Sequence, residues 1–237
     1  MNKATDNVSG QESENIFARS GSATRIHQLE SIFDDSNQNY GKGLDFRTGD
    51  FIRRDGSVRR SLRNLLTEPT PYDVYDAASC LLRYLKLLPE PVIPFDLYDR
   101  FTAAIEDELP PDYAFNHVLP DDFNISKVIA KFQQATFSLP PLNRQLLLYL
   151  LDLLAVFASK SDRNHMTSPR IVAAFQPTFL SRPPSEMSAS DHLLAAETMI
   201  FMVENQDHFL IGMRGGTSRD EEPAKTPVEN TSKAAST

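Results

Sequence analysis

The segment from Leu142 to Ser159 is apolar on nearly every side when it is arranged as a helix, and this feature constrains the fold most. Such a helix has no polar face to present to water, so other helices must surround it. Asp152 lies inside the segment, either as a buried acid with a perturbed pKa or, as is common for aspartate, at an exposed edge. The apolar run from Leu146 to Phe157 is shorter than the roughly 18–20 residues that span a bilayer. We therefore predict a central core helix and no integral membrane segment.

Prolines divide the neighbouring sequence into short helices. The clearest of these begins at Thr70, a helix-capping residue, with Pro71 at the first helical position, where its missing N–H costs nothing. Its apolar residues recur at helical spacing, and Leu82 and Lys86 lie at the rim of that stripe. Further helices are predicted over residues 22–33, 95–105, 125–137, 168–175 (ending at Pro177) and 190–209. Helices with short proline-rich connections predict an all-α helical bundle.

The ends of the chain and one internal connection fall outside this helical pattern. Residues 1–13 and 214–237 are polar and are predicted to be disordered, which leaves one domain over residues 14–213. Residues 34–69 form a connection of unusual length, either functional or an insertion. Its arginines form either a solvated loop or a contact with a partner or with membrane phosphates. The arginines that would contact a membrane peripherally are Arg53, Arg54, Arg59 and Arg60.

Charge and motif content exclude several classes of function. The net charge of −8 argues against a general nucleic-acid-binding protein, because phosphate binding needs a basic face. Cys80 is the single cysteine and is interpreted as a core residue rather than a reactive thiol. With no disulfide and no apolar leader at the start of the sequence, a cytoplasmic location is predicted. The sequence contains no HExxH, GxxxxGK[ST] or GxSxG pattern, so a self-contained enzyme or metal site is not expected.

Four stretches, taken together and in this order, resemble the Rho GTPase-activating domain, particularly its fungal members. The resemblance covers residues 14–213, and its order and spacing make it specific. The stretches are Ile16 to Ser22 (IFARSGS), Leu81 to Pro94 (LLRYLKLLPEPVIP), Leu139 to Phe157 (LPPLNRQLLLYLLDLLAVF) and Asn164 to Leu180 (NHMTSPRIVAAFQPTFL).

The resemblance implies that the chain acts on a Rho-family small GTPase rather than on a substrate of its own. Domains of this family insert an arginine beside the γ-phosphate of the partner, which raises the rate of GTP hydrolysis by about 10³–10⁵. GTP and magnesium would belong to the partner, so no cofactor is expected here. The identity of the GTPase depends on surface complementarity, which the sequence does not reveal.

The position of the catalytic arginine holds Ala18, which carries neither charge nor hydrogen-bond donor. Arg19 is adjacent and is either a substitute or a solvated loop arginine. Family members carry a basic residue where Leu82 stands and an asparagine where Arg170 stands, both at the GTPase contact. Lys86 and Asn164 match the family, as GTPase contacts or as a surface lysine and a helix-capping asparagine.

Two larger departures leave three hypotheses open. The family domain opens with a helix upstream of the Ile-Phe pair, which residues 1–14 cannot supply, and residues 47–69 look like an insertion. The chain is therefore a truncated product or a diverged relative. It is a weakened activator, a module that binds a GTPase without accelerating it, or a structural remnant. Ala18 favours a binding module, and the missing helix favours a remnant.

Overall fold

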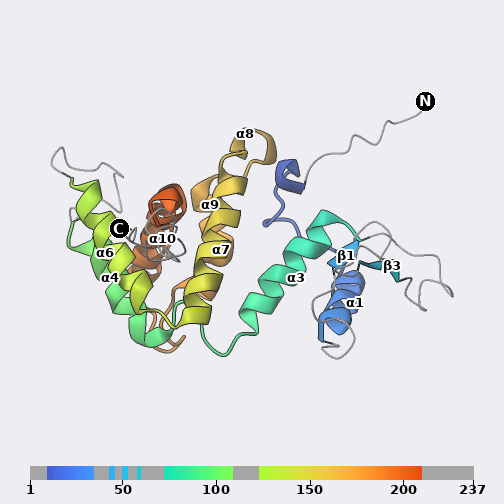
Figure 1. The fold of residues 1–237 in the computed structure, drawn as a ribbon, viewed down its shortest axis with the longest axis horizontal. Coiled ribbons are helices and arrows are strands. Elements are labelled where there is room, and N and C mark those ends of the chain that lie inside the picture. The colour runs from blue at the N-terminus through green and yellow to red at the C-terminus, as the bar shows by residue number, and fades with distance from the viewer. Residues whose placement is uncertain are drawn as a thin grey trace, which may run out of the picture.

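The computed structural model describes residues 10–34, 43–45, 50–52, 58–59, 72–108 and 123–209. Helices dominate these ranges, and the predicted all-α class is confirmed (Figure 1). The long connection also contains a small antiparallel sheet, which is formed by strands β1 (Gly43–Asp45), β2 (Asp50–Ile52) and β3 (Val58–Arg59). Arg53, Arg54, Arg60 and the side chain of Arg59 lie outside the described part, as do most of the predicted disordered ends.

The core of the bundle is built around α7 (Pro141–Ala158), which packs against α9 (Ser168–Phe179) and α10 (Ala189–Glu204). Pro141 stands at the start of α7, where proline is tolerated because the first N–H groups of a helix have no intrahelical partner. The residues of α7 that are buried follow helical spacing and line one side. They are Leu147, Leu150, Leu151, Leu154 and Phe157.

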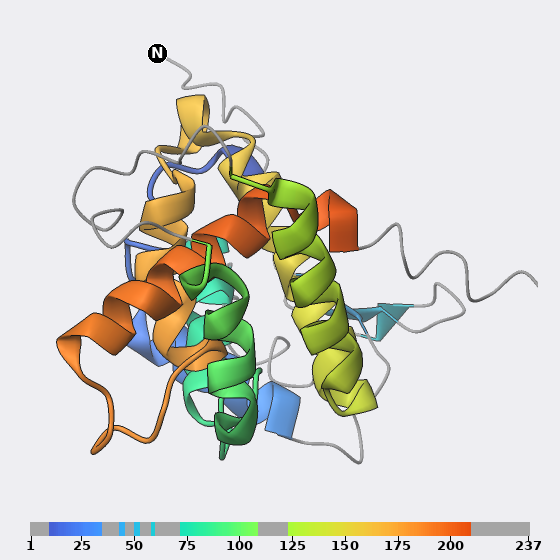
Figure 2. The same cartoon turned by 90° about the vertical axis from the view of Figure 1, so that its left-hand side faces the viewer.

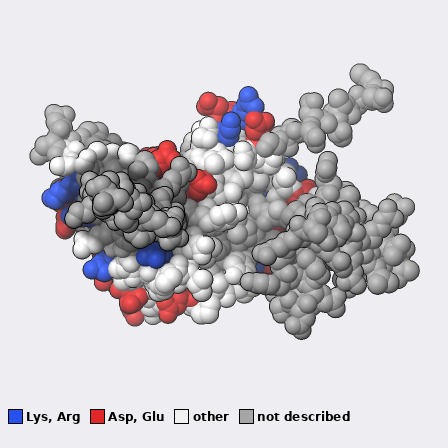
Figure 3. All heavy atoms as spheres, viewed as in Figure 1, with Lys and Arg blue, Asp and Glu red and all other residues white. Residues whose placement is uncertain are grey.

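The opposite side of α7 is exposed, which corrects the expectation of a helix surrounded on every side. The side chains of Leu142 and Tyr149 are 79% and 70% exposed. Asp152 is also exposed, so the interpretation as an edge residue is confirmed. In Figure 3 the surface over α7 is largely free of charge, whereas charged side chains gather over α8 (Ser161–Asn164) and at the end of the bundle formed by α4 (Tyr98–Glu106) and α6 (Ile125–Ser138). Neighbouring helices cover only part of α7, and periodicity alone cannot indicate how many neighbours a helix has.

α7 also meets the length and composition of a membrane span, with 18 residues and a mean hydropathy of 1.3. The apolar run from Leu146 to Phe157, on which the sequence-based prediction rests, is shorter than this helix. The same properties suit a core helix, and five residues of α7 are buried against the bundle. The absence of an integral membrane segment stays a prediction.

α3 (Val74–Lys86) begins later than predicted. Asp73 is its N-cap, and a reciprocal capping box joins the side chains of Asp73 and Asp76 to each other's backbone N–H. These bonds satisfy N–H groups that the first turn leaves without partners, so the helix starts at Val74. The start predicted at Thr70 and Pro71 is therefore wrong, and both residues lie outside the described part.

A second group of helices closes the other end of the bundle. Helix η3 (Phe95–Leu97) leads into α4 (Tyr98–Glu106), which packs against α6 (Ile125–Ser138), as the green and yellow-green ribbons of Figure 2 show. Both helices agree with the predicted ranges. The buried ring of Phe132 stacks on Phe201 of α10 with centroids 5.4 Å apart, so aromatic contacts join α6 to the core.

α9 ends later than predicted, and α1 has the predicted range. α9 continues through Pro177 to Phe179, so the predicted end at Pro177 is wrong. Proline in the last turn removes one backbone N–H, and in the same turn Thr178 donates its hydroxyl to the carbonyl of Phe175 at 2.8 Å. α1 (Ala23–Asp34) has the predicted range with Leu29 fully buried, but Phe33 is 53% exposed.

A groove of about 670 Å³ separates α3 from α7. Its walls are apolar and include Ala77 and Leu81 of α3 and Leu153 and Phe157 of α7. Gly10 lies at its rim, in the short helix η1 (Gly10–Glu12), so the described chain begins beside the groove. From η1 the chain then passes between the upper part of α7 and α3 to reach α1, and this segment carries the candidate site (Figure 1).

Candidate functional site

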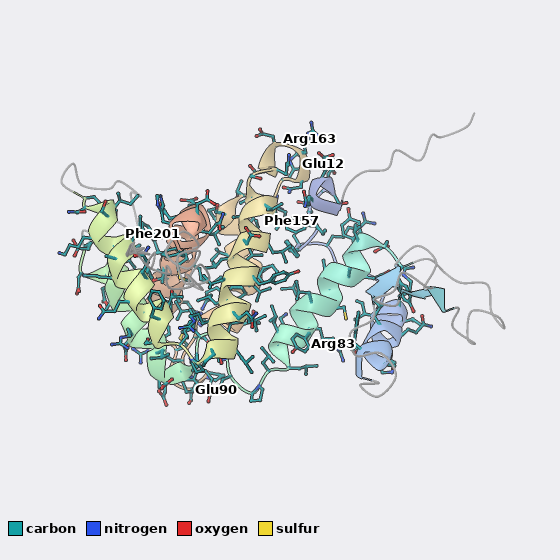
Figure 4. All side chains as sticks on the ribbon, in the orientation of Figure 1. Glu12, Arg83, Glu90, Phe157, Arg163 and Phe201 are labelled. Atoms are coloured by element: carbon teal, nitrogen blue, oxygen red, sulfur yellow. The ribbon has the colours of Figure 1, made fainter. Side chains whose placement is uncertain are left out.

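The motif loop, defined here as residues 15–20, is drawn into the core by its two apolar residues. Ile16 and Phe17 are buried, and the Phe17 ring makes edge contacts with Phe157 at 4.8 Å and Phe175 at 4.9 Å between centroids. Phe157 projects from the upper part of α7 in Figure 4. Burying these side chains leaves the next residue, Ala18, exposed to solvent. The loop therefore presents position 18 outward from a fixed apolar base.

The beginning of the motif loop is held to the end of α8. The backbone N–H of Asn15 donates to the carbonyl of Asn164 at 2.8 Å, and Asn15 adopts a left-handed φ of 54°. Its carbonyl then accepts the N–H groups of Ala18 at 2.9 Å and Arg19 at 2.8 Å. Asparagine tolerates this backbone conformation better than most residues. The turn is thus closed by main-chain bonds that do not depend on the side chain at position 18.

The two residues that follow the motif loop, Gly21 and Ser22, are held to α3. Gly21 donates its N–H to the hydroxyl of Ser79 at 2.9 Å, and Ser22 donates to the carboxylate of Asp76 at 2.7 Å. Gly21 lies so close to α3 that a Cβ on it would stand 2.5 Å from Oδ1 of Asp76. Glycine is needed here because the two backbones approach too closely for a side chain.

Asp76 is a buried charge at this junction. Its carboxylate accepts the Arg25 Nε at 2.5 Å and the Asp73 N–H at 2.9 Å, while Arg25 also pairs with Asp73 at 2.8 Å. Burial acts to raise the pKa of Asp76, but the bonds from Arg25, Asp73 and Ser22 outweigh it and hold the pKa below its ordinary value. The carboxylate therefore stays charged and ties α1 to the start of α3.

Arg19 is exposed but is held against α3. Its guanidinium carbon lies 4.5 Å from the centroid of the Tyr75 ring, and the Tyr75 hydroxyl donates to the carbonyl of Glu14 at 3.0 Å. Helical spacing places Tyr75 on the same side of α3 as the predicted contacts Leu82 and Lys86. Leu82 is half-buried and Lys86 is exposed. The structure therefore aligns Arg19 with the α3 residues that the sequence singled out.

The remaining predicted contacts lie at the junction of α8 and α9. Arg170 is exposed in the first turn of α9 and donates to the carbonyl of His165 at 2.7 Å. Asn164 is fully buried and so has no surface to offer a partner. Nearby, Glu12 and Arg163 form an ion pair between η1 and α8 (Figure 4). Of the two predicted contacts, Asn164 and Arg170, it is Arg170 that is exposed enough for a direct contact.

Comparison with known proteins identifies the family. The model of the RhoGAP domain matches residues 7–184 of the chain. The chain belongs to the RhoGAP domain family. Among curated relatives of this RhoGAP domain, Rho-GTPase-activating protein 5 of Schizosaccharomyces pombe is 32% identical over 195 residues, covering 82% of this chain and 44% of the relative. Rho-GTPase-activating protein BAG7 of Saccharomyces cerevisiae is 26% identical, covering 79% and 38%. The chain therefore spans less than half the length of these relatives.

Solved structures support the same fold for this RhoGAP domain. Human Rho GTPase activating protein 15 superposes with a TM-score of 0.62 at 17% identity, over 84% of this chain and 76% of that one. The BH domain from GRAF, the GTPase regulator associated with focal adhesion kinase, superposes with a TM-score of 0.58 at 20% identity, over 85% and 86%.

Sequence reasoning missed the residues that fix the motif loop. Asp76 is joined to Arg25 across 51 positions of sequence, and no local pattern reveals such a pair. The spacing of Asp73 and Asp76 is a signal that could have placed the start of α3. Across the described ranges, no group of three or more His, Cys, Asp or Glu residues is placed to hold a metal ion.

Proposed function

We propose that this RhoGAP domain binds the GTP-bound form of a Rho-type small GTPase and stimulates its hydrolysis weakly. The observation that carries the proposal is the exposed Ala18, presented by a loop that is fixed at both ends. GTP and magnesium would come with the partner, and the encounter would take place in the cytoplasm. The arginines Arg53, Arg54, Arg59 and Arg60 would add a peripheral membrane contact.

The weakness follows from the chemistry of position 18. An arginine inserted in trans offsets the charge on the γ-phosphoryl oxygens and raises the rate by about 10³–10⁵. Alanine supplies no charge, so this effect is missing while the backbone that would present it is intact. The chain can still bind the GTPase, but binding without the arginine leaves the charge on the γ-phosphoryl oxygens uncompensated. Strong acceleration is therefore not expected of the native chain.

Residual stimulation is assigned to Arg19. Its stacking on Tyr75 contributes about 0.5–1 kcal/mol at an exposed site. A charge-assisted bond to a phosphate oxygen in an interface without water would be stronger, so the guanidinium would leave the ring to bind the phosphate. Lys86 and Arg170, which are both exposed, would pair with acidic groups of the GTPase, and Leu82 would add apolar contact. The same exposed alanine supports a second candidate, a domain that binds the GTPase and shields it from more active relatives.

The test is single-turnover GTP hydrolysis by purified Rho-, Rac- and Cdc42-type GTPases, each with the native chain, Ala18→Arg, Arg19→Ala and the double variant. We expect slight acceleration by the native chain, loss of that acceleration in Arg19→Ala, and a gain of at least about 10²-fold in Ala18→Arg. Acceleration by Ala18→Arg alone would favour the binding-module function. Strong acceleration by native and Arg19→Ala chains alike, or none by any variant despite cooperative unfolding, would contradict the proposal.

A further inference from the structure

Asn164 is a fully buried amide on which four segments of the chain converge. Its Nδ2 donates to the carbonyl of Gln11 at 2.8 Å and to the carbonyl of Phe157 at 2.8 Å. Its Oδ1 accepts the N–H of Met166 at 2.7 Å, and its own carbonyl accepts the N–H of Asn15. One residue therefore bonds η1, the end of α7, the approach to α9 and the motif loop.

This arrangement requires an asparagine side chain. Two carbonyls need donors and one N–H needs an acceptor, and a primary amide supplies both kinds of group from one planar end. Aspartate keeps the acceptor but offers no donor to Gln11 and Phe157. An alanine would leave the buried groups without partners, at a cost of about 1–3 kcal/mol for each. Both N–H donors of the amide are thus used within the chain, and its complete burial keeps it out of reach of a second protein.

The bonds of Asn164 act on the position of the motif loop. Asn15 carries the loop's left-handed residue, and its carbonyl closes the turn that contains Ala18 and Arg19. Because the carbonyl of Asn164 holds Asn15, any movement of Asn164 moves the turn. Ile16 and Phe17 anchor the middle of the loop to the core, and the N–H groups of Gly21 and Ser22 hold the chain that follows it to α3. Asn164 holds the loop's first residue.

We propose that Asn164 is a positioning residue, which fixes the motif loop so that position 18 faces the partner GTPase. It acts through Asn15 and does not touch the GTPase, which replaces the sequence-based interpretation of Asn164 as a direct contact. The effect of Asn164 on GTP hydrolysis rests on the proposed function. Its structural part, the immobilisation of residues 15–19, can be measured on the chain alone.

The first experiment is amide hydrogen exchange on the native chain, Asn164→Ala and Asn164→Asp. We expect the amides of Asn15, Ala18 and Arg19 to exchange at least about ten-fold faster in both variants, while amides of α10 change less than about two-fold. The matched control is Thr198→Val, which removes another fully buried polar group, a hydroxyl that donates to the carbonyl of Leu194 at 2.7 Å. It should leave the loop amides unchanged.

The second experiment measures GTP hydrolysis in the Ala18→Arg background, titrated to saturation with the activator. Adding Asn164→Ala should lower the plateau rate at least about ten-fold, because small misplacements of a catalytic group are costly, and should move the half-saturating concentration less than about three-fold. A merely destabilised domain would show the reverse, an unchanged plateau reached at higher concentration. Thr198→Val supplies that comparison.

The outcomes separate the two proposals. If Ala18→Arg gives no acceleration, the proposed function fails, and the exchange rates of the loop amides still decide whether Asn164 fixes the loop. Unchanged exchange in Asn164→Ala and Asn164→Asp would overturn the inference. An unchanged plateau rate in a variant whose loop amides exchange faster would overturn it as well. If Asn164→Ala does not unfold cooperatively, Asn164→Ser, an uncharged side chain whose hydroxyl can still donate one bond and accept one, carries both measurements.

Discussion

The guanidinium carbon of Arg19 lies 4.5 Å from the centre of the Tyr75 ring. Tyr75 is in turn held by its hydroxyl, which donates to the carbonyl of Glu14 at 3.0 Å. The guanidinium of Arg19 therefore lies against α3, while the side chain of Ala18 is exposed to solvent. Because the two adjacent residues have different surroundings, the effect of a substitution at each can be measured separately.

The stacking of Arg19 on Tyr75 predicts a favourable coupling between the two residues. In a double-mutant cycle with Arg19→Ala and Tyr75→Leu, the coupling free energy from urea unfolding should be about 0.5–1 kcal/mol. Tyr75→Phe is the matched control, since it keeps the ring and loses the hydroxyl, and it should retain most of the coupling. A coupling of zero would show that the stack contributes nothing to stability.

The close approach of Gly21 to α3 predicts that a single methyl group there is destabilising. In Gly21→Ala the new Cβ would meet Oδ1 of Asp76 at 2.5 Å and its backbone N at 2.7 Å, which forces the backbones apart. We expect a loss of about 1–3 kcal/mol in the free energy of unfolding. Gly10→Ala is the comparison, because its Cβ would meet a Val74 methyl at 3.4 Å, an ordinary contact. Equal effects of the two variants in urea denaturation would contradict this account.

The buried carboxylate of Asp76 predicts a loss of stability in acid. Its folded pKa lies below the ordinary 3.8, so its full contribution is present above that value and is lost as the pH falls through the lower, folded pKa. Asp76→Asn should cost about 1–3 kcal/mol at pH 7 and show a shallower decline in acid. Urea unfolding across that range is the measurement. Asp152→Asn, at an exposed position, should change stability by less than about 0.5 kcal/mol.

The anchoring of Phe17 predicts that the motif loop and the core stabilise each other. Phe17→Ala removes a ring that contacts Phe157 and Phe175 and should cost about 3–5 kcal/mol. Phe33→Ala removes a ring of the same size that is 53% exposed and should cost less than about 1 kcal/mol. Thermal melts of both variants against the native chain provide the measurement. A small effect of Phe17→Ala would mean that the loop is not part of the cooperative unit.

Much of the fold could be predicted because local patterns agree with tertiary contacts. The ranges of α4 and α6 follow from apolar spacing between prolines, and the burial of Ile16 and Phe17 agrees with their place in a family motif. α7 was predicted as a helix but not as a half-exposed one, because Leu142 and Tyr149 give no sign of how many neighbours cover them.

The candidate site was less accessible to sequence reasoning for a physical reason. Its geometry depends on bonds between distant segments, such as Asn15 with Asn164 and Ser22 with Asp76, and a single sequence records no such pairing. The capping pattern of Asp73 and Asp76 indicates the start of α3 more directly than Pro71 does. Whether Leu82, Lys86 and Arg170 contact a GTPase stays a prediction, as do the domain boundaries.

The exposure of Ala18 has a consequence for how this domain changes over generations. The turn that presents it is held by Asn15, Asn164 and Asp76, and none of their bonds involves the side chain at position 18. Natural selection for a folded chain is therefore blind to that residue. A lineage can therefore exchange arginine and alanine at this position without losing the fold, so a relative with the arginine and a relative without it can share one stable domain.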